Sequence, residues 1–534
     1  MTRRLRATVV AGALLLPVVI GGFSIREHVA HDGARVFDQV MSLVSDRFVD
    51  TVDASALYEK AARGLVTQLH DPYSELFSPT ELKRFSTQST GRYGGIGMQI
   101  ENQDGNIVVV HVFSHSPAQA AGVQDGDHII GIDTASTRGW SSQQVSDVLI
   151  GTVGTQVKVR FSRPGVSEAI ENTFTRAEIH VPAVPYSLML TDKIAYIPLQ
   201  TFNEDAADEL DNAVNGLVKQ GAKSIVLDLR NNPGGILDQG LQVADLFLKS
   251  GQQIASVRMR QGQPQVYTAH DDEHVQNVPL VVLVDGHSAS AAEIVTGALQ
   301  DHDRALVVGT TSFGKGLVQT VFPIDGGWAL KITTGKWYTP SGRSIQKNRK
   351  PADPELVGAS PPDDTPPDSL EKESVKQNRP TYRSDAGRIV YGGGGITPDV
   401  IVADDTISTP EQTFFKAIAP KYPAVRGVLY SYALELKGSV SPTFTVKPEW
   451  RDEFYRRLQA AKIAVDRAQY NAAAPLVDRW IGGQIAELAF GDSTAFRRQI
   501  PDDSQLQRAM DLLRKGATQK DLFSMAQASR PEKR

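Results

Sequence analysis

The chain has 534 residues, which at roughly 100–200 residues per domain predicts three or four domains. Its 41% hydrophobic and 22% charged residues are ordinary for a chain that buries cores, so wholesale disorder is excluded. The net charge of −5 gives no broad basic surface for nucleic acid. The absence of cysteine excludes disulfides, thiolate zinc sites and a cysteine nucleophile.

The N-terminal residues have the pattern of an export signal. Arg3, Arg4 and Arg6 precede an uncharged apolar run from Ala7 to Phe23, and a basic head followed by an apolar run is typical of a signal peptide or signal anchor. The run is long for a cleaved signal, and no small-x-small cleavage site follows it. We therefore expect residues 1–30 to be a retained inner-membrane anchor with the rest of the chain on the periplasmic side, and cleaved secretion is the alternative.

Two regions of different character follow the anchor. Residues 31–88 place apolar side chains at helix spacing, and Asp71-Pro72 ends the second expected helix. Residues 89–176 begin with a cluster of glycines and continue with short β-rich runs, such as Ile107–Val112 and Val157–Phe161. The pattern predicts a small β-rich domain with one short helix.

Residues 177–346 alternate apolar strands with helices, which predicts an α/β sheet covered on both faces. The expected strands are Ile194–Leu199, Ser224–Leu229, Leu280–Val284 and Ala305–Val308, and the expected helices are Ala206–Lys219, Leu237–Lys249 and Ala291–Gln300.

The rest of the chain divides into three parts. Residues 347–388 carry seven prolines and many charges, which predicts a mobile exposed insertion. Residues 389–404 are expected to return to the core. Residues 405–534 are expected to be mainly helical, with helices at Trp450–Tyr470 and Gln505–Lys515.

Ser290 is the first candidate catalytic residue, because it follows an apolar strand and opens a helix. A serine at such a turn can expose its hydroxyl, and the nearby helix-terminal amides can hold an oxyanion. The spacing of Ser290 and Glu293 also fits a capping box, so the segment alone favours a helix cap over catalysis.

A nucleophilic serine needs a base, and the sequence offers two kinds. His287 and His302 lie near Ser290 in the sequence, which leaves a Ser-His-Asp set open. Lys315 lies in an apolar stretch, where a lysine loses its charge more easily, although a solvated turn lysine is the commoner case.

Three further motifs allow other interpretations. Gly309–Lys315 matches most of a phosphate-binding loop, but Gly316 replaces the required Ser or Thr and a strand is expected next. The turn that ends in Gly234 and Gly235 can bring backbone amides close to a ligand, or it is an ordinary strand-to-helix turn. His270–His274 could bind a metal, but a solvated polar loop is favoured.

Five motifs in order resemble those of the carboxyl-terminal processing (tail-specific) proteases, serine peptidases of family S41 with an inserted PDZ domain. In chain order the motifs are Leu-Asp-Leu-Arg-Asn-Asn-Pro-Gly-Gly, Ser-Ala-Ser-Ala-Ala-Glu-Ile, Phe-Gly-Lys-Gly-Leu-Val-Gln, Tyr-Thr-Pro-Ser-Gly-Arg-Ser-Ile-Gln and Gly-Ile-Thr-Pro-Asp-Val. The resemblance covers about residues 35–346 and 393–402. The family often has serine where Ala292 stands, and the resemblance does not extend beyond about residue 405.

The resemblance implies a multidomain α+β protein. It would have an α/β serine-protease core (177–346 and 389–404), an inserted PDZ domain (89–176) and helical N- and C-terminal regions (31–88 and 405–534).

The resemblance also implies the site residues. Ser290 would be the nucleophile, Lys315 the general base and Gln319 the residue that orients the lysine. The oxyanion hole would use the amide of Ala291 and one from Gly234 or Gly235. The carboxylate-binding loop of the PDZ domain would be formed by Gly94, Gly95, Ile96, Gly97 and Met98.

The implied function is an endopeptidase that cleaves proteins at or from unstructured C-terminal tails, with no metal or other cofactor and no nucleic acid partner. An adaptor or activator and a homo-oligomer are left open. An inactive PDZ scaffold that tethers partners is the alternative of a different class, and the intact Ser290, Lys315 and Gln319 argue against it. A nucleotide enzyme is opposed by Gly316.

Overall fold

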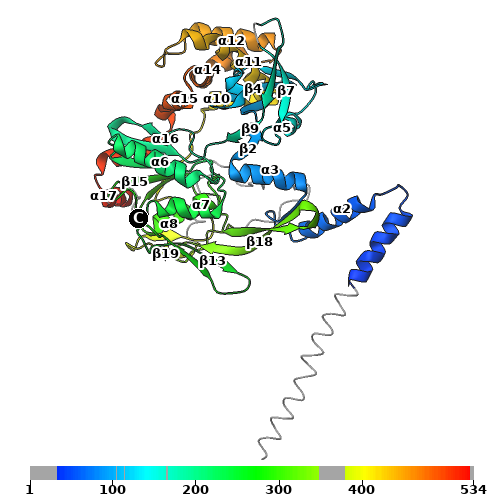
Figure 1. Cartoon of the computed structure of the whole chain (residues 1–534). Coiled ribbons are helices and arrows are strands. Elements are labelled where there is room, and N and C mark those ends of the chain that lie inside the picture. The colour runs from blue at the N-terminus through cyan, green and yellow to red at the C-terminus, as the bar shows by residue number, and fades with distance from the viewer. Residues whose placement is uncertain (1–32, 104, 114, 164–165, 348–378, 529–534) are drawn as a thin grey trace, which may run out of the picture. The chain divides into compact units, whose positions relative to one another are not determined.

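The computed structural model describes residues 33–528 except 104, 114, 164–165 and 348–378 (Figure 1). The expected anchor over residues 7–23 and most of the expected insertion lie outside these ranges, so both stay predictions. Within the described ranges, no helix combines the length and the apolarity that crossing a bilayer requires. The chain forms two compact units, which are described separately.

The first unit contains the described residues up to Pro79 and residues 319–333. It is helical over residues 33–47 and in α2 (Ala54–Thr67), as the apolar spacing predicted. Asp53 begins α2 by accepting the N–H groups of Ser55 and Ala56. β1 (Glu75–Phe77) then pairs antiparallel with the first part of β18 (Trp328–Tyr338).

The second unit is built around a six-stranded sheet in the order β10-β11-β12-β15-β16-β21, and every neighbouring pair except β10–β11 is parallel. Its strands are β10 (Leu188–Met189), β11 (Ile194–Pro198), β12 (Ser224–Asp228), β15 (Leu280–Val284), β16 (Leu306–Gly309) and β21 (Val400–Ile401). Its first helices are α6 (Ala206–Lys219), α7 (Leu237–Asp245) and α8 (Ala291–Asp301). The predicted elements are confirmed, except that α7 ends four residues early, where turns begin.

Both faces of this sheet are covered, as the apolar strands predicted. Ile225 and Leu227 of β12 pack on one face with α6, α7 and α8. Val226, between them, points to the other face, because successive strand residues alternate, and there it packs with α16 (Ser504–Lys515) and α17 (Gln519–Ala528). The helices α16 and α17 therefore complete the core around this sheet (Figure 1).

A second six-stranded sheet, antiparallel throughout, belongs to the inserted β-rich domain. Its order is β3-β4-β5-β7-β8, with β6 beside β5. The elements are β3 (Met98–Gln103), β4 (Asn106–Val112), α4 (Pro117–Ala120), β5 (His128–Ile132), β6 (Ala135–Ser136), α5 (Ser142–Leu149), β7 (Gln156–Ser162) and β8 (Ile170–Thr175). The chain enters and leaves through paired antiparallel strands, β2 (Arg92–Gly95) and β9 (Ala177–His180). This pairing is the geometry of an insertion.

The second unit contains further antiparallel strands outside the two six-stranded sheets. β13 (Gln253–Met259) pairs with β14 (Gln265–Thr268) and with the second part of β18. β19 (Thr381–Arg383) and β20 (Ile389–Tyr391) form a hairpin. The first of these two strands falls inside the stretch expected to be a mobile insertion. β17 (Leu317–Ile324), most of which belongs to the first unit, pairs with β18. α3 (Pro79–Thr90) precedes the inserted domain.

The C-terminal region before α16 is helical, as predicted, and has a core of its own. Its helices are α10 (Thr409–Ile418), α11 (Tyr422–Leu436), α12 (Pro448–Ala460), α13 (Arg467–Ala472), α14 (Ala474–Phe490) and α15 (Asp492–Gln499). The prediction of a single helix over Trp450–Tyr470 is wrong, because two helices, α12 and α13, occupy this stretch. Lys462 takes a left-handed conformation (φ 57°) after α12, and Asp466 caps the start of α13.

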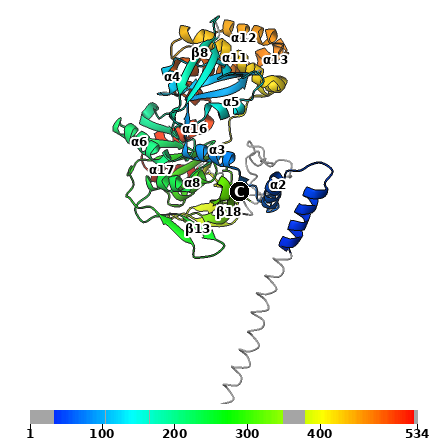
Figure 2. The ribbon, with the colours of Figure 1, turned by 45° about the vertical axis from the view of Figure 1, so that its right-hand side comes forward.

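This helical region also contacts the inserted domain. α11 packs on β3, and the hydroxyl of the buried Tyr430 donates to the carbonyl of Val109 on β4 at 3.1 Å. Figures 1 and 2 show α11 and α12 beside the strands of the inserted domain in both views.

Candidate active site

Ser290 lies in a strained turn between β15 and α8. Asp285 accepts the amides of His287 and Ser288 at 3.0 and 2.9 Å and so folds the chain back after the strand. Ser290 has φ 55° and ψ −114°, a conformation that costs a non-glycine residue about 1–3 kcal/mol and that is typical of nucleophile turns. The turn places a partly exposed serine at the N-terminus of α8.

Glu293 joins the serine turn to the lysine loop. Its side chain is 0% exposed and accepts four hydrogen bonds. One oxygen accepts the amides of Ser290 and Lys315, both at 2.9 Å, and the other accepts Ser312 Oγ at 2.5 Å and the amide of Gly314 at 2.7 Å. Burial raises the pKa of Glu293, and the four hydrogen bonds oppose this shift. The backbones of Ser290 and Lys315 are therefore fixed to a single carboxylate oxygen.

Lys315 lies in the loop between β16 and β17. Its carbonyl accepts the indole N–H of the buried Trp337 at 3.0 Å, which adds a second fixed point to its backbone. Because Glu293 occupies the amides of Gly314 and Lys315 and the strand β17 follows, this loop is not built to hold a phosphate. The geometry of this loop and the presence of Gly316 both argue against a nucleotide-binding enzyme.

The glycine turn lies directly against the serine. A Cβ on Gly234 (φ 92°) would meet Ala289 O at 2.7 Å, Ser290 Cβ at 2.8 Å and Ala291 N at 2.9 Å, so only glycine fits there. The amide of Gly234 donates to Asn232 Oδ1 at 2.8 Å. Within the described part of the chain, the amides of Gly235 and Ala291 have no hydrogen-bond acceptor.

The histidines near Ser290 do not form a triad with it. His302 lies at the far end of α8, and its two ring nitrogens contact Asp385 and the carbonyl of Gln253, both at 2.7 Å. His287 is exposed. The lysine remains the better candidate for the base.

Gln319 lies on β17, in the first unit, where its side-chain Nε2 donates to Thr333 Oγ1 at 3.2 Å. A role in orienting Lys315 stays a prediction. In the polar loop His270–His274, His274 contacts Asp211 and Glu273 pairs with Arg304. Across the described ranges, no three metal-ligating side chains come together.

A groove of about 510 Å³ opens along the inserted domain. Four of the five predicted loop residues line it, namely Gly95, Ile96, Gly97 and Met98, whereas Gly94 pairs with β9. α5 contributes Ser142, Gln143, Ser146 and Leu149, and residues outside the inserted domain contribute Val181, Thr201 and Asn203.

The loop at one end of this groove has free donors. Among the described residues, no acceptor is found for the amides of Ile96 and Gly97. Gly97 has φ 82°, and a Cβ there would meet Ser116 Cβ at 2.2 Å. Burial raises the pKa of Tyr93, on the wall of the groove, to about 12, so its phenol stays protonated. Free amides beside an apolar wall can bind a terminal carboxylate.

Sequence reasoning missed the main role of Glu293. The spacing to Ser290 predicted a cap, and the carboxylate does accept the Ser290 amide. No local signal, however, indicated its contacts with Ser312, Gly314 and Lys315, about 20 residues further along the chain.

Comparison with protein families gives three matches. The model of peptidase family S41 matches residues 193–356, that of the PDZ domain matches residues 94–172, and that of the activating protease CtpB N-terminal domain matches residues 26–78. The first covers four strands of the six-stranded core sheet, β11, β12, β15 and β16, and the second covers most of the inserted domain. None of the three reaches the C-terminal helices.

Two relatives similar in sequence are carboxy-terminal processing proteases. Carboxy-terminal processing protease CtpA of Bacillus subtilis is 35% identical over 342 residues, which are 64% of this chain and 73% of that protein. The carboxy-terminal-processing protease of Bartonella bacilliformis is 36% identical over 314 residues, 58% of this chain and 72% of that protein. Among solved structures, a photosystem II D1 C-terminal processing protease is 30% identical and aligns over 57% of this chain and 82% of its own, with a TM-score of 0.35.

Proposed function

This chain belongs to the carboxy-terminal processing proteases of peptidase family S41, and from that membership we propose that it cleaves proteins at or from their C-terminal tails with Ser290 and Lys315. The observation that carries the proposal is the buried Glu293. One of its two carboxylate oxygens accepts the backbone amides of both Ser290 and Lys315, each at 2.9 Å. A carboxylate that fixes the backbones of a strained serine and a nearby lysine suits a nucleophile and its base.

In the proposed reaction, the Lys315 amine accepts the hydroxyl proton of Ser290, and Oγ attacks the carbonyl carbon of the scissile peptide. The amides of Ala291 and Gly235 donate to the oxyanion. We assign this role to Gly235 because the amide of Gly234 already donates to Asn232. The amine leaves with the proton from Lys315, and water then hydrolyses the acyl-enzyme. Gln319 is proposed to orient the lysine.

The groove of the PDZ domain is proposed to bind the tail. The amides of Ile96 and Gly97 would hold the terminal carboxylate, and the tail would add as a strand along β3. The buried Ile96 and Met98, together with Leu149, make the wall apolar. We therefore propose unstructured tails that end in an apolar residue as substrates.

Amidation of the tail tests this recognition. A protein substrate with an unstructured, apolar tail is expected to lose at least about tenfold in kcat/KM when its terminal carboxylate is amidated, because charge-assisted hydrogen bonds to backbone amides are lost. Cleavage is followed by mass spectrometry. A peptide that contains only the cleavage site is the control and should be cleaved equally slowly with either terminus. Equal cleavage of the free and the amidated protein would contradict tail recognition through the carboxylate.

A further inference from the structure

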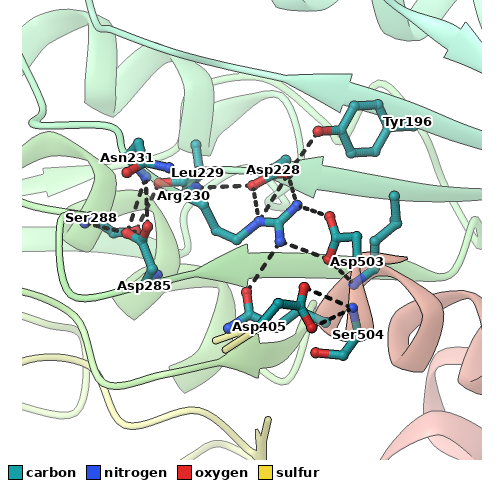
Figure 3. Close-up of polar contacts among 12 residues, drawn as sticks. Tyr196, Asp228, Leu229, Arg230, Asn231, Asp285, Ser288, Asp405, Asp503 and Ser504 are labelled. Carbon is teal, nitrogen blue, oxygen red and sulfur yellow. Dashed lines mark hydrogen bonds and ion pairs between the residues drawn. The ribbon is translucent and has the colours of Figure 1, made fainter. Parts of the chain in front are cut away.

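The helix α16 brings an acidic residue from the C-terminal region to the end of β12. Asp503 caps α16 by accepting the amide of Leu506 at 2.9 Å. The same carboxylate accepts two hydrogen bonds from Arg230, from Nη1 at 2.9 Å and from Nη2 at 2.7 Å (Figure 3). This two-point pair is largely buried, because the side chains of Arg230 and Asp503 are 17% and 14% exposed. It joins residues that are 273 positions apart in the chain.

Arg230 is held on its other side by the strand itself. Asp228 accepts Nε at 3.0 Å and Nη2 at 2.6 Å, and Tyr196 donates its hydroxyl to the same carboxylate at 2.7 Å. Gln505, also on α16, accepts Nη1 at 3.2 Å. The guanidinium thus lies between a carboxylate of the core and a carboxylate of the C-terminal helix, as Figure 3 shows.

The turn beside the nucleophile begins at this arginine. Asn231, the next residue, has φ 57° and donates its amide to Asp285 at 3.0 and 3.1 Å. Asn232 accepts the amide of Ala289, which precedes Ser290, at 2.9 Å, and its side chain accepts the amide of Gly234. The turn is therefore tied to the serine loop along its length, and at its start it is tied to α16 through Arg230.

We propose that Asp503 is a positioning residue for the oxyanion turn, which makes the C-terminal helix α16 a part of the catalytic machinery. The inference rests on the proposed function. By holding Arg230 at two points, Asp503 fixes the end of strand β12. The turn that starts there places Gly234 against Ser290 and directs the amide of Gly235 toward the oxyanion. Without the Asp503 carboxylate, the pair with Asp228 would remain, but only the single hydrogen bond to Gln505 would tie the guanidinium to α16.

The variant Asp503→Asn separates this role from helix capping. Asparagine caps a helix as well as aspartate does, but it lacks the charge and the second acceptor oxygen that the two-point pair requires. In the full-length protein, kcat is expected to fall about tenfold, with KM and binding of a tail peptide unchanged. Asp466→Asn is the matched control, because Asp466 caps α13 in the same region and is exposed. It should retain wild-type kcat.

Two measurements decide the proposal. In hydrogen exchange of the full-length protein, the amides of residues 229–232 and 234–236 are expected to exchange faster in Asp503→Asn than in Asp466→Asn. Unchanged exchange overturns the proposal even if no substrate is cleaved. In the Arg230→Gln background, Asp503→Asn should lower kcat no further. An equal drop in both backgrounds also overturns it, because Asp503 would then act independently of Arg230. Loss of all cleavage in wild type, with the exchange difference intact, counts against the proposed function alone.

Discussion

Replacing Glu293 by glutamine is expected to lower kcat by about 100-fold while the protein stays folded. Each of its two carboxylate oxygens accepts two hydrogen bonds. In glutamine an NH₂ group replaces one of these oxygens, and because NH₂ cannot accept a hydrogen bond, the two donors that face it are left without an acceptor. A buried N–H without an acceptor costs roughly 1–3 kcal/mol. The loops of Ser290 and Lys315 would relax to avoid that cost and move the two residues apart. Steady-state kinetics and a thermal melt check this result.

Glu411→Gln is the matched control for this variant. Glu411 is 5% exposed, accepts the amide of Ser408 in the capping box of α10 at 2.7 Å, and pairs with Arg479. Both partners belong to the C-terminal helical region, since Ser408 caps α10 and Arg479 lies on α14. The Glu411→Gln variant should cleave as wild type does. A folded Glu293→Gln protein with wild-type kcat would show that the carboxylate does not position the site.

Replacing Gly234 by alanine is the second change with a large expected effect, a loss of at least about 100-fold in kcat. The new Cβ would lie 2.8 Å from Ser290 Cβ and 2.7 Å from Ala289 O, closer than real Cβ atoms come. Either the serine or the glycine turn must move, and a displacement of about 1 Å at a reacting group costs on the order of 100-fold in rate. Because φ is 92°, some stability is also lost.

Gly251→Ala separates the collision from the backbone strain. Gly251 has φ 84°, but a Cβ there would meet nothing within 4 Å. We expect a loss of about 1 kcal/mol in the free energy of unfolding and no change in kcat. If both alanine variants lose stability equally and keep wild-type kcat, the close approach of the glycine turn to Ser290 has no catalytic importance.

The core elements could be predicted because local patterns specify them. The runs Ile225–Leu227 and Leu280–Val284 are apolar on both sides, which is the mark of strands covered on both faces. Ser290 followed by Glu293 placed the start of α8 correctly. The break between α12 and α13 was missed because Lys462 carries no turn signal, although its backbone is left-handed.

The contacts that assemble the site could not be predicted from local patterns. Glu293 meets the loop of Lys315 only because β15 and β16 are neighbours in the sheet. Asp503 meets Arg230 only because α16 covers the second face of that sheet. Nothing in the spacing of residues 405–534 indicated that they cover the protease core. A capping motif specifies one turn of helix, whereas these contacts depend on the whole topology.

The most direct test of the central claim is cleavage of an unstructured protein with an apolar tail by wild type, Ser290→Ala and Lys315→Ala, followed by mass spectrometry. We predict that wild type cleaves and that both variants are slower by at least about 1,000-fold. Both variants should still bind the tail, because the groove lies on the PDZ domain. Cleavage that survives Ser290→Ala at the wild-type rate would contradict the assignment of the nucleophile, and with it the account of this site.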